Sequence, residues 1–137
     1  MRWKLSFDKY SRFRREPVLN IARTNREEDA YYTTVFEVDE KVFDALLRRE
    51  MGETNTERFK QGDAIPYESH RPVSLDSRYG PTVIFLIPPE GTKRSSTTWN
   101  AEYVRIVKKG IEESYRGKML QTNLQALRRA VEESQED

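Results

Sequence analysis

Trp3-Lys4-Leu5-Ser6-Phe7-Asp8, close to the start of the chain, alternates apolar and polar side chains. Successive side chains of a strand point to opposite faces of a sheet, so Trp3, Leu5 and Phe7 would share one face. This alternation predicts a half-buried β-strand, and residues 18–22 predict a second one. The chain therefore begins as a sheet.

The next part of the chain predicts a strand followed by a helix. Residues 31–38 are mostly β-branched and aromatic, which favours a third strand. Asp39 is placed to cap a helix that runs through Met51, because its carboxylate can accept hydrogen bonds from the free N–H groups of the first turn. Gly52 is placed to end that helix.

The second half of the chain changes from turn-rich to helical. Residues 53–80 are polar and rich in turn formers, so we expect a long polar loop with a short optional strand around residues 73–75. Residues 82–87 form a continuous apolar run, which predicts a central strand covered on both faces. Apolar residues at helical spacing then predict two helices, over residues 99–115 and 118–133.

Together these elements predict a single α+β domain over residues 1–137, in the order βββα(β)βαα. A mainly antiparallel sheet of four to five strands would pack against three helices, and the C-terminal third would be helical. An acidic tail, residues 132–137, holds four acids and no base.

Composition excludes several classes of protein. The chain has no cysteine, which rules out disulfide frameworks and thiolate zinc sites. Its longest apolar run covers residues 83–87, whereas a membrane-spanning helix needs about 20 residues. The alternating N-terminus does not match a secretory signal. We therefore expect a small soluble cytoplasmic protein with no membrane partner.

The net charge of +1 conceals blocks of opposite sign. Residues 2–26 hold eight basic and two acidic side chains, a balance of +6. Residues 27–63 hold five basic and eleven acidic side chains, a balance of −6, and residues 64–131 return to +5 with eleven basic and six acidic ones. Local fields, and not the overall charge, would therefore select a partner.

One candidate binding site lies in the loop expected between the first two strands. Arg12, Arg14 and Arg15 are candidate phosphate contacts, and Tyr10 and Phe13 are candidate stacking residues for unpaired bases. The alternative is that both aromatic rings pack onto the sheet while the arginines stay in water. Further basic residues that could extend this patch are Lys4, Arg23 and Arg26.

A second candidate site lies in residues 88–98, between a predicted strand and a predicted helix. A helix N-terminus presents free backbone N–H groups and attracts phosphate. Gly91 permits close approach of the backbone, and Lys93 and Arg94 add positive charge, so both are further candidate phosphate contacts. The alternative is an exposed basic loop with a Ser or Thr cap.

Other chemistry has less support. Asp29, Glu37 and Asp39 flank one predicted strand and suggest a metal-dependent nuclease, although turn formation and helix capping account for two of them equally well. His70 is the only histidine, and the sequence contains neither a Gly-x-Ser-x-Gly elbow nor a Walker-type phosphate loop. We expect no catalytic residue, metal or cofactor, and we expect both tryptophans to be packed aromatics.

The predicted function is a non-catalytic binding module for nucleic acid, single-stranded or structured, or for another phosphorylated ligand. The first alternative is a protein–protein interaction module, such as an inhibitor, an adaptor or an assembly subunit, which a homodimer would also fit. The second alternative is a metal-dependent nuclease.

Overall fold

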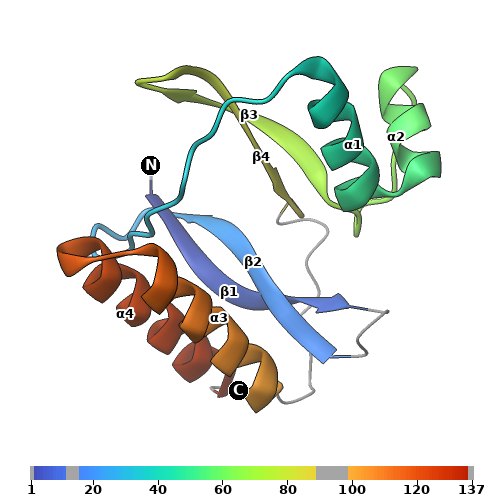
Figure 1. Ribbon diagram of the computed structural model, residues 1–137. Coiled ribbons are helices and arrows are strands. Elements are labelled where there is room, and N and C mark those ends of the chain that lie inside the picture. Colours follow the sequence, from blue (N-terminus) through green and yellow to red (C-terminus); the bar gives the residue numbers. More distant parts are fainter. Residues whose placement is uncertain (1, 12–15, 89–98, 136–137) are drawn as a thin grey trace. The chain divides into compact units, whose positions relative to one another are not determined.

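The computed structural model describes residues 2–11, 16–88 and 99–135 (Figure 1). Four strands and four helices follow one another in the order ββααββαα, which confirms the α+β class and the helical C-terminal part. The chain divides into two compact units. Unit 1 comprises residues 1–33 and 93–137, and unit 2 comprises residues 34–92. Each unit contains one hairpin and one pair of helices.

The hairpin of unit 1 pairs β1 (Arg2–Ser11) with β2 (Glu16–Thr24) in an antiparallel register that sets Leu5 opposite Ile21. A bulge between Ser6 and Lys9 shifts this register by one residue. Bulges leave a backbone group unpaired. On β2, the N–H of Leu19 donates to the hydroxyl of Tyr103 at 3.1 Å instead, which ties the hairpin to the helical part.

Helices α3 (Ala101–Ser114) and α4 (Gly117–Gln135) lie against one face of this hairpin (Figure 1). The core between them consists of buried side chains from the strand and from both helices: Leu5, Phe7, Ile111, Leu127 and Ala130. The predicted parity is therefore correct for Leu5 and Phe7. Trp99 packs against the same cluster, as expected for a core aromatic.

Unit 2 begins with two helices joined through a single glycine. Helix α1 (Glu40–Met51) starts where Asp39 Oδ1 accepts from the N–H of Val42 at 2.8 Å, which confirms the predicted cap. Gly52 ends α1 with a φ of +80°, a conformation that glycine adopts without steric cost, and helix α2 (Glu53–Lys60) follows at once.

The second hairpin pairs β3 (Arg71–Ser77) with β4 (Gly80–Leu86), antiparallel along the full length of both strands. Helix α1 packs on this hairpin, with the rings of Phe43 and Phe85 6.4 Å apart. Among the described residues of this unit, the buried apolar side chains are Leu47, Met51, Leu86 and Ile87.

An arginine links the two helices of unit 2. Arg48 of α1 pairs with Asp44 at 2.9 Å on its own helix and with Glu57 of α2 at 2.7 Å. Lys60 also pairs with Asp44. The hydrogen bonds from Lys60 and then Arg48 lower the pKa of Asp44, while the bonds to Asp44 and then Glu57 raise the pKa of Arg48.

The strand predicted over residues 31–38 is wrong, because these residues carry no regular secondary structure. The side-chain amide of the fully buried Asn123 forms two hydrogen bonds with the backbone of Tyr32. It accepts from the N–H of Tyr32 at 2.8 Å and donates to the C=O of Tyr32 at 3.0 Å. Strand propensity mainly reports a fit to a pleated, half-buried surface. No neighbouring strand is available here within the described residues.

The described part of the chain contains four antiparallel strands, as predicted, but the single sheet is wrong, because these strands form two separate two-stranded hairpins. Strand β4 has one strand neighbour and is not a central strand. The expected short strand at 73–75 is part of the longer β3. The region predicted as the loop 53–80 contains a fourth helix, α2. Ion pairs from Arg48 of α1 to Glu53 and Glu57 stabilise this helix.

The acidic tail needs a similar correction. Residues 132–135 belong to α4, and Glu133 forms an ion pair with Lys4 at 3.1 Å. Residues 136–137 lie outside the described part of the chain. None of the described helices is both long and apolar enough to span a membrane. The expectation of a single domain stays a prediction.

Candidate functional site

Most of the residues predicted to bind a ligand lie outside the described part of the chain: Arg12, Phe13, Arg14, Arg15, Lys93 and Arg94. Tyr10 belongs to β1 by its backbone and pairs with Pro17, but its side chain is likewise not described. The two arginine-rich stretches therefore remain predictions. The described residues around them define which other cations are available to a ligand.

Lys4 and Arg26, two of the three residues expected to extend the N-terminal patch, are engaged in ion pairs. Lys4 contacts Glu133 at 3.1 Å, and Arg26 contacts Glu28 at 2.8 Å and Glu133 at 3.7 Å. The hydrogen bond to Glu28 is the main reason why the pKa of Arg26 is raised. These two cations are partly neutralised and contribute less to any field around the hairpin.

Arg23, the third of these residues, has a different environment. Its guanidinium lies over the ring of Trp3, 5.1 Å from the centroid. Strand pairing explains this contact, because Trp3 and Arg23 are direct cross-strand partners and their side chains share one face of the hairpin. Arg23 is exposed, and so is Arg2, which precedes Trp3 on the opposite strand and pairs with Thr24. Among the described acids, none forms an ion pair with either arginine.

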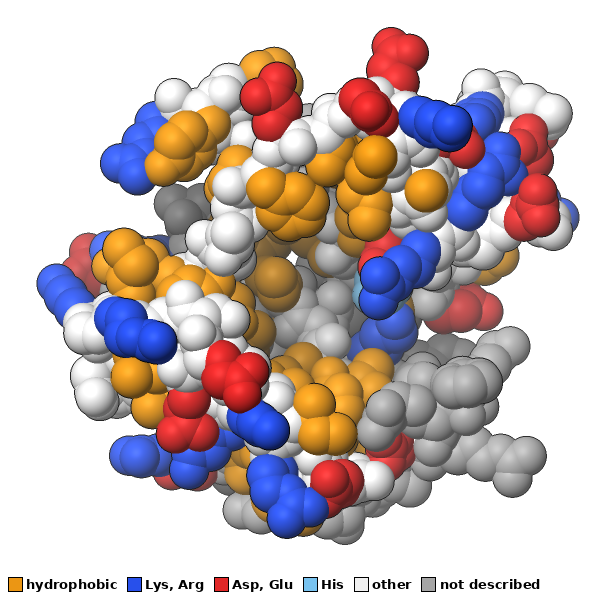
Figure 2. Space-filling model, in the orientation of Figure 1, with side chains coloured by type: hydrophobic (Ala, Val, Ile, Leu, Met, Phe, Trp, Pro, Cys, Tyr) orange, Lys and Arg blue, Asp and Glu red, His pale blue; other side chains and the backbone are white. Residues whose placement is uncertain are grey.

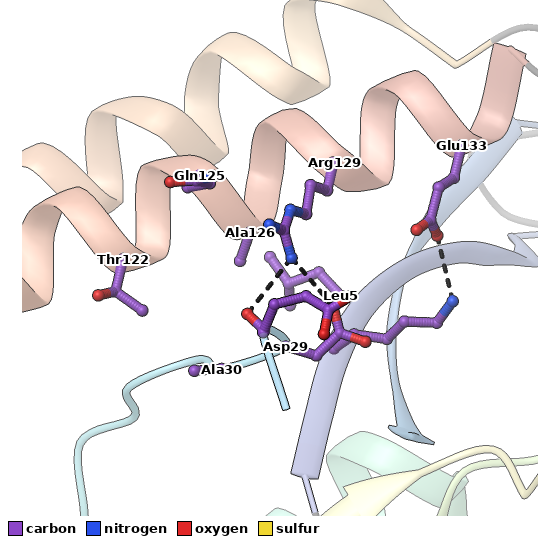
Figure 3. Close-up of a pocket in the computed structure, with 10 residues that line it drawn as sticks. Leu5, Asp29, Ala30, Thr122, Gln125, Ala126, Arg129 and Glu133 are labelled. Atoms are coloured by element: carbon purple, nitrogen blue, oxygen red, sulfur yellow. Dashed lines mark hydrogen bonds and ion pairs between the residues drawn. The ribbon is translucent and has the colours of Figure 1, made fainter. Parts of the chain in front are cut away.

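A polar pocket of about 190 Å³ lies between α4 and the start of the hairpin (Figure 3). Figure 3 shows the side chains of Arg129 and Glu133 reaching from α4 toward the strand and the turn before residue 30. The residues that line it are Lys4, Leu5, Glu28, Asp29, Ala30, Thr122, Gln125, Ala126, Arg129 and Glu133.

The charges of this pocket are paired with one another. Asp29 is only 4% exposed and accepts from the hydroxyl of Thr24 at 2.9 Å, while its other oxygen lies 3.5 Å from Arg129. Arg129 also donates to the backbone carbonyl of Glu28 at 3.3 Å. This arrangement holds the turn and β1 to α4. Because Asp29 and Arg129 already bind each other and their neighbours, neither presents an unpaired charge to a ligand.

The contacts of Arg129 and Glu133 were not predicted from the sequence. The residues lie one turn apart, at i and i+4, and so share one side of α4. A basic and an acidic residue at this spacing is the only signal in the sequence, and it does not reveal partners more than 100 positions away, such as Lys4.

Two of the three acids in the nuclease hypothesis have structural roles. Asp29 is paired with Thr24 and Arg129, and Asp39 caps α1. The third acid, Glu37, is exposed in the irregular stretch before that helix. Within residues 2–11, 16–88 and 99–135, no group of three or more histidines and acids is arranged to hold a metal ion.

The two units differ in charge. The ranges of unit 1 contain 17 basic and 12 acidic residues, a balance of +5, whereas those of unit 2 contain 7 and 11, a balance of −4. Over α1 and α2, Figure 2 shows acidic and basic side chains interleaved, as expected from the ion pairs of Arg48. The chain therefore joins a basic unit to an acidic one.

Comparison with protein-family models, with curated proteins and with solved structures finds no match for this chain.

Proposed function

We propose that unit 1 binds nucleic acid or another phosphorylated ligand without covalent chemistry. The observation that carries this proposal is the division of charge, +5 in unit 1 against −4 in unit 2. Phosphate backbones bind basic surfaces through counterion release, a contribution that does not depend on base sequence. A polyanion would therefore favour unit 1 and be repelled by unit 2.

The state of the individual cations in unit 1 supports the same proposal. Arg2 and Arg23 are exposed, and neither forms an ion pair with a described acid. Binding a phosphate at these positions requires no ion pair with a described acid to be broken. The sequence adds Arg12, Arg14 and Arg15 between the two strands, so the proposal places phosphate contacts along this hairpin.

Fluorescence anisotropy with a labelled single-stranded oligonucleotide tests the proposal on the full chain. We expect saturable binding at 50 mM salt that weakens steeply at 200 mM, because each released counterion contributes a slope of about −0.7 in log K against log salt for a single strand. Replacing Arg12, Arg14 and Arg15 together by Gln should reduce that slope by about 2, from three contacts at this value each.

A matched triple variant in unit 2 controls for net charge. Lys41, Arg49 and Arg58 are exposed, and none forms an ion pair with a described acid, so their replacement by Gln removes the same charge from the other unit. We expect this variant to bind like the wild type. Absence of salt-sensitive binding in the wild type, or equal losses in both triple variants, would refute the assignment to unit 1.

A protein-interaction role is the second candidate, and one observation favours it. In the stretch 31–38, Phe36 is 69% exposed and Val35 is 46% exposed, and neither makes a hydrogen bond through its backbone to a described residue. An exposed β-prone segment can pair through its backbone with a strand of another chain, and Val35 and Phe36 are the residues we propose for this contact.

Light scattering at several protein concentrations separates the two candidates. A mass that rises with concentration, and returns to that of the monomer in Phe36→Asp, would favour self-association through residues 31–38. Wild-type protein that stays monomeric at all concentrations would rule out self-association, and a protein-interaction role would then require a different protein as the partner.

A further inference from the structure

The cross-strand pair Trp3–Arg23 differs from an ordinary packed aromatic. The antiparallel register sets the two residues directly opposite each other, and the guanidinium lies 5.1 Å from the ring centroid. Direct cross-strand neighbours have Cβ atoms about 5 Å apart, so this contact is fixed by the backbone of β1 and β2. The ring is consequently held in place at the open end of the hairpin.

Trp3 also differs from the other tryptophan of the chain. Trp99 packs against the core cluster of unit 1, whereas Trp3 is half-buried and is not among the described side chains that pack there. The core packing expected for Trp3 is therefore not seen in the described residues. A large aromatic at the margin of a basic hairpin is available for a ligand in a way that a core residue is not.

We propose that Trp3 is a base-stacking residue and that the ligand of unit 1 is single-stranded nucleic acid. This inference rests on the proposed function and adds the class of ligand to it. Arg23 is exposed and has no carboxylate partner among the described residues, so it can leave the ring for a phosphate. An unpaired base then stacks on the face of the Trp3 ring that Arg23 has left. The planar guanidinium of Arg23 is thereby replaced by the larger planar base.

Unpaired bases are required by this arrangement. Bases inside a duplex are already stacked on their neighbours and present only their edges in the grooves. A polyphosphate has no ring to place on Trp3. Stacking on an aromatic side chain is tolerant of base identity, so we expect a preference for single strands and little preference for sequence.

Unit 2 contains two similar pairs that serve as internal controls. Arg78 lies over Tyr79 at 4.8 Å, and Arg71 lies over Tyr67 at 5.6 Å. Both tyrosines are largely exposed, but they belong to the unit with a balance of −4. The surrounding charge disfavours a polyanion there, so the same local geometry should not bind nucleic acid.

Tryptophan fluorescence of the full chain tests the inference in a Trp99→Phe background, where Trp3 is the only tryptophan. The probes are oligothymidine and an inorganic polyphosphate with the same number of charges. We expect oligothymidine to quench Trp3 and to bind more tightly than polyphosphate. Trp3→Ala, measured by anisotropy, should weaken oligothymidine binding about 5- to 150-fold, the equivalent of one lost stacking contact.

Trp3→Phe should lose less affinity than Trp3→Ala, because a smaller ring remains for stacking, and Tyr79→Ala should bind like the wild type. Equal binding of both probes without quenching would overturn the stacking role and leave the proposed function intact. Binding of neither probe would overturn both. Equal losses in Trp3→Ala and Tyr79→Ala would also overturn it, since the charge of the unit would then not matter.

Discussion

The two units of this protein are built from the same parts and assembled differently. Each has one antiparallel hairpin and two helices. In unit 2 all four elements come from one continuous stretch, and its helix–helix ion pairs join residues only 5 to 16 positions apart. In unit 1 the hairpin comes from the start of the chain and the helices from the end, so contacts such as Lys4–Glu133 span 129 positions.

This difference shows that the two units depend on contacts of different sequence separation. Contacts between nearby residues close short loops at small entropic cost, whereas the core of unit 1 requires the two ends of the chain to meet. Unit 1 also carries the basic charge, and unit 2 the acidic charge. The unit that depends most on long-range contacts is therefore also the one to which we assign the ligand.

Leu127→Ala tests the core of unit 1 and should have the largest effect on stability. Leu127 is 4% exposed and packs among side chains of the strand and the helices, so its removal leaves a cavity. We expect the free energy of unfolding to fall by about 2–5 kcal/mol in urea titrations followed by circular dichroism. Leu47→Ala, at an equally buried position of unit 2, is the matched comparison. An unchanged urea midpoint for Leu127→Ala would contradict the described core.

Asn123→Ala tests the link between α4 and the backbone of Tyr32. The substitution leaves one N–H and one C=O without their partner, at 2.8 and 3.0 Å in the structure. We expect a loss of about 1–3 kcal/mol in the free energy of unfolding. Gln125→Ala, an exposed position on the same helix, should change it by less than about 0.5 kcal/mol. If both variants behave alike, the amide does not hold this segment.

The Lys4–Glu133 pair should have a smaller effect. Both side chains are about one-third exposed, so a double-mutant cycle with Lys4→Met and Glu133→Gln should give a coupling of about 0.2–1 kcal/mol. This coupling should shrink when salt is raised, because partly exposed charges are screened. A coupling of zero at low salt would show that this ion pair does not help to join the two ends of unit 1.

The smallest expected effect is on the pH dependence of stability, and it concerns Asp44 of unit 2. The pKa of Asp44 is lowered in the folded chain by its hydrogen bonds from Lys60 and Arg48. A lowered pKa contributes stability above the unfolded value of 3.8, and this contribution is lost as the pH falls below that value. We expect Asp44→Asn to lose less stability than the wild type between pH 5 and about pH 2, measured by urea unfolding at each pH. Parallel pH profiles for the two proteins would contradict the role of Asp44.

Prediction from the sequence was most successful where a structure depends on neighbouring residues. Asp39 caps α1 and Gly52 ends it, as the sequence indicates, because both act within one turn of the helix. The strand over residues 31–38 was wrong for the opposite reason. Its side chains favour a strand, but a strand forms only when another strand pairs with it. Helix α2 was missed because its support comes from Arg48 of the preceding helix.

The candidate site divides in the same way. Basic residues interleaved with aromatic ones are visible in the sequence, and from them the phosphate contacts were predicted. The pairing of Trp3 with Arg23 was not predicted, because it depends on the register of two strands 20 positions apart. The same register explains why Trp3 is half-buried at the end of the hairpin and not in the core.

By itself, the sequence determined the α+β class, the helical C-terminal part, the caps of α1 and the alternation of charge along the chain. Only the tertiary structure decided that the strands form two hairpins and that Arg23 lies over Trp3. It also decided that Lys4 and Arg26 each form an ion pair with Glu133. The physical reason is the range of the forces involved. Periodicity and capping act over a few residues, whereas strand partners and ion pairs depend on which distant residues meet when the chain folds.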